Sequence, residues 1–143
     1  MYTINEIVHN SPAYEEAVVL RYEILRKPLK LQFTQEQLDA EKDNYHLGLY
    51  NGEKLIAYLM LEPHADKKVK MKQVVVDAVW QGKGIGTRLV RDAEIFCRKK
   101  GFEWIYCHAR DTAVPFYKKL EYAQIGDMFQ EVTIPHYYFE KKL

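Results

Sequence analysis

A glycine-rich segment between a strand-like stretch and a helix-like stretch is the part of this sequence best suited to hold a ligand. It reads Gln81-Gly82-Lys83-Gly84-Ile85-Gly86-Thr87. The preceding residues 72–77 are rich in β-branched side chains, as expected for a buried strand. The following residues place their apolar side chains on one helical face. Such a strand–turn–helix unit directs free backbone N–H groups and the positive end of a helix dipole at the turn, and this predicts a phosphate ligand.

The spacing of the glycines excludes two common phosphate-binding loops. A dinucleotide fingerprint needs glycines at relative positions one, three and six and an acid further on. Here Gly82, Gly84 and Gly86 stand at positions one, three and five, and residues 104–109 contain no acid. A P-loop needs Ser or Thr directly after Gly-Lys, a place that Gly84 occupies here. What remains is Gln-x-x-Gly-x-Gly after a strand.

This remaining pattern resembles the pyrophosphate loop of the GNAT superfamily, the acetyl-CoA-dependent N-acetyltransferases. A second segment, residues 113–122, reads Ala-Val-Pro-Phe-Tyr-Lys-Lys-Leu-Glu-Tyr and is similar to the family signature Ala-x-x-Phe-Tyr-x-Lys-Leu-Gly-Phe. Residues 134–139 are similar to the closing strand of one bacterial branch of the family. The resemblance covers residues 44–143 well and the first 43 residues loosely.

The resemblance implies acetyl-CoA as a co-substrate and indicates where it binds. The backbone N–H groups of residues 82–87 are expected to face the pyrophosphate. Lys83 and Arg88 either add charge there or lie in solvent. Strand 74–76 is expected to open away from its neighbour, so that the amide of Val75 or Val76 faces the thioester oxygen. The predicted cofactor residues are Val74, Val75, Val76, Gln81, Gly82, Lys83, Gly84, Ile85, Gly86, Thr87 and Tyr117.

The same resemblance implies a catalytic acid. Acetyl transfer needs a proton donor for the departing thiolate. In the family, the tyrosine of Phe-Tyr lies beside the thioester sulfur, and the corresponding residue here is Tyr117. A phenol with a pKa of ~10 keeps its proton at neutral pH; the alternative is a tyrosine that only fills the seam between helix and sheet. Many relatives have a pantetheine-binding asparagine where this chain has Arg110, so that contact is lost or is made by Asp111 or the backbone.

The base that takes the proton from the acceptor amine is left open by the sequence. Four residues near strand ends are candidates, although a residue of this kind more often has a structural or surface role: Glu62, His64, His108 and His136. His108 and His136 are the preferred candidates, without a choice between them. Arg21 and Arg26 are interpreted as a solvated helix face rather than as contacts to an anionic part of the substrate.

The elements that must position these residues can be outlined from local signals. Ser11 and Pro12 begin a first helix, which Pro28 ends, and Gly101 ends the helix that follows the glycine loop. Asn51-Gly52 is expected to be a hairpin turn, and Asp111 is expected to cap the helix that carries Tyr117. The other expected elements are a helix over residues 34–41, strands 2–8, 45–50, 54–61, 69–77 and 104–109, and two closing strands.

These elements predict one α/β domain over residues 1–143 with helices on both faces of a mixed sheet. The family resemblance implies the GNAT fold, a mostly antiparallel sheet of about six to seven strands flanked by about four helices. With 48% hydrophobic residues, the chain has enough apolar material for one core. Cys97 and Cys107 are expected to be core residues in a reducing compartment. No pair of histidines has metal-ligand spacing, so no metal site is expected.

Composition limits the partners. The net charge is +1 and the charges alternate in sign, which argues against a nucleic-acid or membrane surface. A cytoplasmic location and, through the aromatic C-terminal strand, a homodimer are compatible with the sequence. The predicted function is transfer of an acetyl group from acetyl-CoA to a primary amine of a small molecule or peptide, by direct attack in a ternary complex. A non-catalytic acyl-CoA-binding module and a protein-interaction domain are the alternatives.

Overall fold

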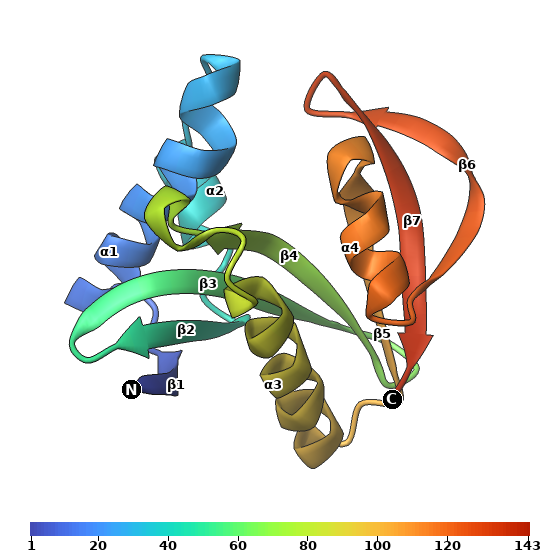
Figure 1. The fold of residues 1–143 in the computed structure, drawn as a ribbon, viewed down its shortest axis with the longest axis horizontal. Helices are drawn as coiled ribbons and strands as arrows, with labels where there is room; N and C mark the ends of the chain where they lie inside the picture. The colour runs from blue at the N-terminus through green and yellow to red at the C-terminus, as the bar shows by residue number, and fades with distance from the viewer.

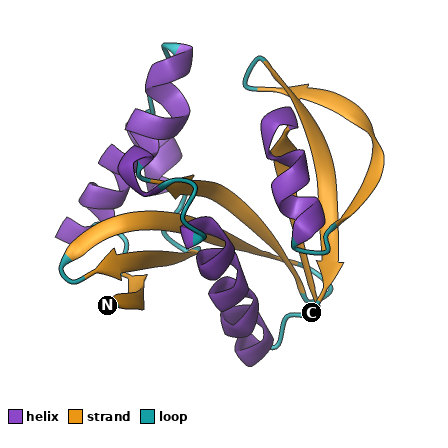
Figure 2. Ribbon diagram, viewed as in Figure 1, coloured by secondary structure: helices purple, strands orange, loops and turns teal.

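The computed structural model describes residues 1–143 as one seven-stranded sheet with four α-helices (Figures 1 and 2). The strand order is β1-β2-β3-β4-β5-β7-β6, and every neighbouring pair is antiparallel except β4 and β5. The strands are β1 (Tyr2–Ile7), β2 (Tyr45–Asn51), β3 (Lys54–His64), β4 (Lys68–Val76), β5 (Trp104–Arg110), β6 (Ala123–Glu131) and β7 (Ile134–Lys142). The helices are α1 (Pro12–Arg21), α2 (Gln35–Asp39), α3 (Ile85–Lys100) and α4 (Val114–Lys119). This is the predicted fold class.

The helices cover both faces of the sheet, and the central strand β3 is accordingly apolar and buried from residue 55 to residue 61. Alternate side chains of a strand point to opposite faces. Tyr58 and Met60 belong to the cluster that includes Ala17 of α1. Leu59, between them, belongs to the larger cluster that includes Leu89 of α3. A strand covered on both faces reads as a continuous apolar run, and this explains why the strand from residue 55 to 61 shows no alternation.

Local signals set most helix ends as predicted. The Ser11 hydroxyl accepts a hydrogen bond from the Tyr14 N–H at 3.2 Å, and Pro12 is the first residue of α1. α1 then continues through a π-helical turn (Tyr22–Arg26) and a 3₁₀ turn (Lys27–Leu29). α3 begins after Gly84 and ends at Gly101, and both glycines have left-handed φ values, of 78° and 92°.

Two local predictions were wrong in detail. Asn51 pairs with Lys54, so the two-residue turn is Gly52-Glu53 rather than Asn51-Gly52. The left-handed φ of 62° falls on Gly52, the residue that adopts it at least cost. The helix with Tyr117 is preceded by a 3₁₀ turn over Asp111–Ala113. The Asp111 carboxylate accepts from the next N–H along the chain, at 2.9 Å, instead of capping α4.

The sheet divides at its one parallel pair. β4 and β5 pair only from Lys68–Lys70 to Trp104–Tyr106, although β4 continues to Val76 and β5 to Arg110. Beyond that seam the two strands diverge, and Figure 1 shows the opening between them. A register shift between β3 and β4 and a left-handed φ of 56° at Gln73 mark a bulge in β4 at the same place. Bulges bend a strand and increase its local twist, which directs the end of β4 away from β5.

The C-terminal strand lies inside the sheet rather than at its edge. β7 pairs with β5 on one side and with β6 on the other. Its backbone groups are therefore already used, and a homodimer through this strand, as the sequence analysis considered, has no free edge to form on. Cys97 and Cys107 are both buried and unpaired, as expected for core residues. No helix has the length and apolar character needed to cross a membrane.

Candidate active site

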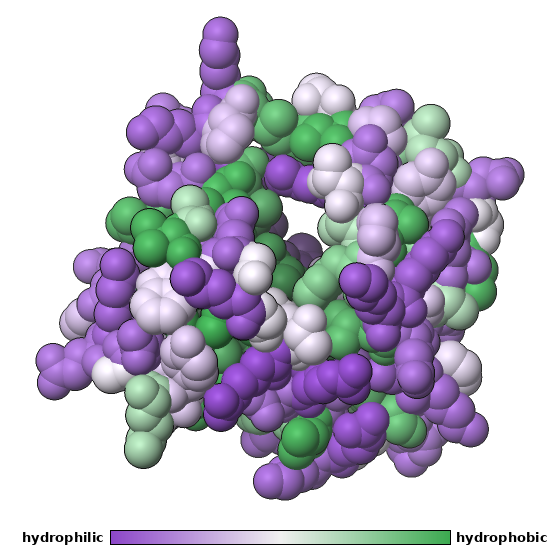
Figure 3. All heavy atoms as spheres, in the orientation of Figure 1, coloured by the Kyte–Doolittle hydropathy of each residue, from purple (hydrophilic) through white to green (hydrophobic).

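The divergence of β4 and β5 opens a cleft of about 380 Å³ in the middle of the molecule. It is lined by Met71 and Val74 from β4, by Cys107 and Ala109 from β5, and by Tyr117 from α4. The space-filling view shows the hollow between the two halves of the sheet (Figure 3). Binding clefts for small molecules have volumes of this order and combine apolar walls with a few polar groups.

The glycine loop lies where β4 ends and α3 begins. The first α-helical hydrogen bond runs from the Arg88 N–H to the Gly84 carbonyl at 3.1 Å, and no side chain caps the helix. The N–H groups of residues 85–87 therefore precede the first helical bond and can be donated to a phosphate. The Gln81 side-chain amide donates to the Val76 carbonyl at 2.9 Å and ties the loop to the strand.

The glycines of the loop are required for two different reasons. At Gly84 a Cβ would meet nothing, but the φ of 78° is one that side chains disfavour. At Gly86 a Cβ would lie 3.4 Å from the Phe116 ring and 3.5 Å from the Val76 side chain. Gly84 thus allows the turn, and Gly86 lets the first turn of α3 pack closely against α4 and β4.

Backbone alternation decides which amides of β4 face the cleft. The Asp77 N–H donates to the Ile56 carbonyl of β3 at 2.8 Å. Successive N–H groups of a strand point in opposite directions, so those of Val74 and Val76 point away from β3. The N–H of Val75 points towards β3. Beyond the seam no strand stands opposite Val74 and Val76 on the cleft side.

Tyr117 is buried at the base of the cleft beside Cys107. Burial, together with the neighbouring Cys107 thiol, raises the pKa of Tyr117 well above its ordinary value of 10.0. Burial also raises the pKa of the Cys107 thiol to about 12, although a hydrogen bond from Tyr117 opposes that rise. This part of the cleft therefore keeps a phenol protonated and strongly disfavours a thiolate.

His108 and His136 are brought together by a carboxylate that the sequence analysis did not identify. Glu131 Oε1 lies 3.0 Å from His108 Nδ1, and Glu131 Oε2 lies 3.8 Å from His136 Nε2. All three residues line the cleft. Burial alone would raise the pKa of Glu131, but the hydrogen bond to His108, with the charges of His108, Lys70 and His136, outweighs it and lowers that pKa. Glu131 is thus an anion at neutral pH.

The two histidines differ in what their ring nitrogens can do. A carboxylate oxygen only accepts, so His108 Nδ1 donates to Glu131, and a neutral His108 ring carries its lone pair on Nε2. The His136 ring is almost fully buried, and its Nδ1 donates to the Ile134 carbonyl at 2.8 Å. Of the two, His108 has the nitrogen available for proton transfer.

The other two candidate bases do not line the cleft. Glu62 accepts hydrogen bonds from Lys72 Nζ at 3.2 Å and pairs with His64 Nε2 at 2.7 Å. Burial would raise the pKa of Glu62, but the contacts with His64 and Lys72 lower it overall. Both side chains lie at the end of β3, where they form a hydrogen bond with each other.

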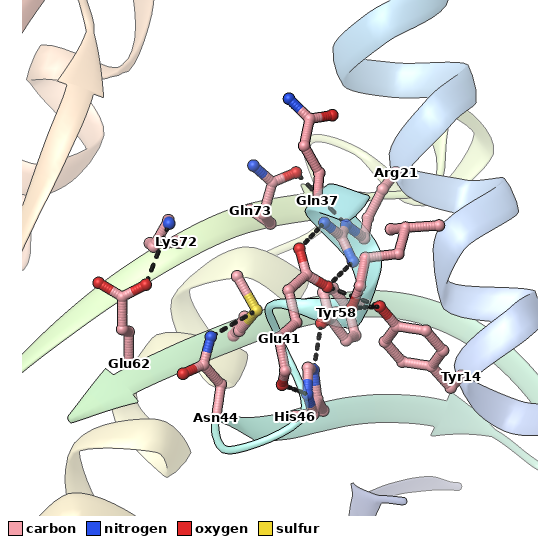
Figure 4. A network of polar contacts seen from close by, with 12 residues as sticks. Tyr14, Arg21, Gln37, Glu41, Asn44, His46, Tyr58, Glu62, Lys72 and Gln73 are labelled. Carbon is pink, nitrogen blue, oxygen red and sulfur yellow. Dashed lines mark hydrogen bonds and ion pairs between the residues drawn. The ribbon is translucent and has the colours of Figure 1, made fainter. Parts of the chain in front are cut away.

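Arg21 was interpreted as part of a solvated helix face, and this interpretation was wrong. Its guanidinium is completely buried and forms two hydrogen bonds with the Glu41 carboxylate, at 2.8 and 2.7 Å (Figure 4). Tyr14 donates to the same carboxylate at 2.7 Å, and Arg21 Nε donates to Gln73 at 3.3 Å. The network ties α1 and the segment that follows α2 to the bulge of β4. Arg26, in contrast, lines the cleft.

No local signal in the sequence marks Glu131 as a site residue. Glu131 precedes the turn Val132-Thr133, in which both residues have left-handed φ values, 52° and 61°. Such a turn is normally marked by Asn-Gly, and neither residue is present. The pairing of Glu131 with Ile134 across that turn is what brings the carboxylate to the end of the cleft. No group of three or more His, Cys, Asp or Glu side chains is arranged to hold a metal ion.

The fold and the cleft define a class of protein, and comparison with known proteins agrees. The chain belongs to the GNAT family: the family model described as an acetyltransferase (GNAT) domain matches residues 8–143. The chain is 25% identical over 134 residues to the uncharacterized N-acetyltransferase YjcF of Bacillus subtilis (strain 168), covering 91% of this chain and 93% of that protein.

Solved structures share the whole fold. Escherichia coli ElaA superposes with a TM-score of 0.84 at 18% identity, covering 99% of both chains. An aminoglycoside 6'-N-acetyltransferase in complex with coenzyme A superposes with a TM-score of 0.82 at 16% identity, covering 98% of this chain and 96% of that one. The protein is thus an acetyltransferase that transfers an acyl group from an acyl-CoA to an acceptor. Membership of this family favours the enzyme over both the protein-interaction domain and the non-catalytic module.

Proposed function

We propose that the protein transfers the acetyl group of acetyl-CoA to a primary amine by direct attack in a ternary complex. The observation that carries the proposal is the cleft between β4 and β5, which is lined by a buried tyrosine and a histidine–carboxylate pair. One of its walls is the strand that leads into the glycine loop. A thioester held along β4 would have Tyr117 on one side of its carbonyl and His108 near the amine.

The cofactor is held mainly by backbone. The N–H groups of residues 82–87, with Gln81 fixing the loop, bind the pyrophosphate, and Lys83 adds charge. The cleft-facing backbone groups of Val74 and Val76 bind the pantetheine arm. The amide of Val74, which lines the cleft together with Tyr117, is the donor to the thioester oxygen, and Val75 faces β3 instead. Fixed donors at this oxygen stabilise the oxyanion of the tetrahedral intermediate.

The proposed reaction moves one proton from the amine to the sulfur and leaves both His108 and Tyr117 in their starting states. The nitrogen lone pair of the neutral amine forms a C–N bond with the thioester carbon, and His108 Nε2 takes the nitrogen proton. The C–S bond then breaks with its electron pair on sulfur, and the Tyr117 hydroxyl protonates the thiolate. The proton on His108 returns to the Tyr117 oxygen through water. The products are the N-acetylated amine and free coenzyme A. The environment that raises the pKa of Cys107 drives protonation of the thiolate.

Initial rates of thiol release, with acetyl-CoA and an amine varied against each other, test this proposal. The amine panel should contain amino acids, polyamines, amino sugars, aminoglycosides and short peptides. Double-reciprocal lines that intersect are expected for a ternary complex. Parallel lines, or an acetylated enzyme detected by mass spectrometry without an acceptor, would contradict direct attack. Absence of amine-dependent thiol release across the panel would contradict the choice of acceptor class.

A further inference from the structure

The cleft has an excess of positive charge that the proposed chemistry does not use. Four cationic side chains line the cleft, whereas Glu131 is the only carboxylate that does so. The cationic residues are Arg26, Lys70, Lys72 and Arg110. Lys72 is paired with Glu62, but the other three take part in none of the ion pairs of the chain.

The two arginines are held in place while most of their donors stay free. The Arg26 guanidinium lies over the Phe33 ring, 4.6 Å from its centroid. Arg110 Nη2 donates to the Leu25 carbonyl at 3.2 Å, next to Arg26 in the chain. A guanidinium carries five N–H donors, so each side chain can still offer a pair of donors to a bidentate anion. Both are half-buried, which strengthens any charge interaction inside the cleft.

Neighbouring cations disfavour the charged forms of Arg26 and Lys70. Burial and the charges of Arg21 and Arg110 lower the pKa of Arg26, although Glu41 and Glu131 oppose this. Burial and the charge of Lys72 likewise lower the pKa of Lys70, although Glu131 and Glu62 oppose this. An anionic group placed among Arg26, Lys70 and Arg110 would relieve this repulsion.

The phosphates of the cofactor do not account for the positive charge. None of residues 82–87, which are proposed to bind the pyrophosphate, lines this cleft. The thioester end of acetyl-CoA, which does enter the cleft, is uncharged. The positive charge is therefore available to the acceptor.

Resting on the proposed N-acetyltransferase function, we propose that the acceptor is an amine that also carries a carboxylate or phosphate, and that Arg26 and Arg110 bind this anion. Lys70 lines the same cleft and adds to its positive charge. The cations also lower the pKa of an amine bound beside them, because they disfavour its ammonium form. The anion thus anchors the substrate, and the same positive field favours the neutral amine that attacks. A polycationic acceptor would be repelled from this cleft.

Matched acceptor pairs test the proposal in a thiol-release assay. Carboxylate pairs are lysine with 1,5-diaminopentane and phenylalanine with phenethylamine; the phosphate pair is O-phosphoethanolamine with ethanolamine. We expect at least one anionic member to show a kcat/KM about tenfold or more above that of its partner, a difference typical of one good charge contact. The pair that shows this difference identifies whether the site prefers a carboxylate or a phosphate. Equal or better use of the members that lack the anionic group would overturn the proposal.

Variants connect the preference to the arginines. Arg26→Gln and Arg110→Gln should raise the KM of the anionic acceptor about tenfold or more and leave the KM of acetyl-CoA unchanged, and Arg110→Lys should recover part of the loss. Arg98→Gln, at the exposed end of α3, is the matched control and should behave as the unmodified protein. An anion preference that survives both glutamine variants would contradict the assigned residues.

Calorimetry separates this proposal from the proposed function. The anionic members of the three pairs are titrated into the complex of the protein with coenzyme A, which cannot turn over. Binding that Arg110→Gln abolishes would support the anion site even if no acceptor were acetylated. Acetylation without any anion preference would support the enzyme but reject the site. The inference would be overturned if no anionic member bound to the complex and none was preferred as an acceptor.

Discussion

At the level of single residues, the proposed chemistry depends on Tyr117 keeping its proton beside a site that disfavours thiolates. The buried Cys107 thiol reports on that site, because its pKa is raised to about 12 by the same burial. A thiolate leaving from acetyl-CoA at this place gains most of its stability by taking a proton. The hydroxyl of Tyr117 is therefore needed after the cofactor has bound, and not for binding it.

Replacing Tyr117 with Phe should lower kcat by about 10²–10⁴-fold, the range for loss of a general acid. The dissociation constant of acetyl-CoA should change little, because the ring and its packing remain. Single-turnover rates and equilibrium binding of both proteins measure the two quantities. Equal turnover in the two proteins would remove Tyr117 from the mechanism.

The buried pair of Arg21 and Glu41 should dominate the acid sensitivity of the fold. Burial would raise the pKa of Glu41, but the hydrogen bonds and charge of Arg21 lower it below 4.5 overall. A carboxylate with a lowered folded-state pKa stabilises the protein above its unfolded-state pKa. That contribution is lost as the pH falls through the folded-state pKa.

Glu41→Gln should therefore destabilise the protein at pH 7 by about 3–5 kcal/mol, because it leaves a fully buried guanidinium without its counter-charge. Between pH 6 and pH 3 its free energy of unfolding should fall less than that of the unmodified protein. Urea unfolding at several pH values measures both. Glu36→Gln, on the exposed face of α2, is a control that should change neither quantity. Parallel pH curves for Glu41→Gln and the unmodified protein would contradict this role.

At the level of elements, α3 has a left-handed glycine at both ends, but we propose a cofactor-binding role for only one of them. Gly84 and Gly101 both have left-handed φ values, and a Cβ at either would meet no other atom. A side chain at either position is thus disfavoured by the backbone alone. Only Gly84 belongs to the loop whose free N–H groups face the end of the cleft.

Gly84→Val and Gly101→Val should each cost about 1–2 kcal/mol of stability, the cost of the left-handed conformation for a side-chain-bearing residue. Only Gly84→Val should also weaken the binding of acetyl-CoA, because relaxation of the strained turn displaces the N–H groups of the loop. Thermal unfolding and calorimetric titration of the two variants distinguish the effects. Unchanged affinity in Gly84→Val would reject the loop as the pyrophosphate site.

At the level of the whole molecule, two parts of the sheet are joined by a short seam. β1 to β4 and β5 to β7 share only three residue pairs of parallel ladder. Glu94 of α3 adds a link across the seam, since it accepts hydrogen bonds from Tyr122 at 2.8 Å and from Lys141 at 3.1 Å. A cofactor in the cleft would contact both parts and complete the connection that the diverging strands leave open.

Coenzyme A at about 100 times its dissociation constant should stabilise the protein by about 2.7 kcal/mol, which raises the Tm by several degrees. Amide hydrogen exchange should slow at Val74, at Val76 and over residues 85–87. The amides of α2, which lie outside the cleft, provide the internal reference. No change in Tm at saturating coenzyme A would contradict the assignment of the cleft.

The sequence alone determined the features that depend on neighbouring residues. The cap at Ser11, the left-handed glycines at both ends of α3 and the strand–loop–helix unit follow from backbone sterics and local hydrogen bonds, which a few consecutive residues specify. Only the tertiary structure decided how distant residues meet. Arg21 forms hydrogen bonds with Glu41, 20 residues away, and His108 forms one with Glu131, 23 residues away. The divergence of β4 from β5 depends on a bulge and on strand pairing across the sheet. These pairings are set by competition among all buried and charged groups at once, and no local pattern records that competition.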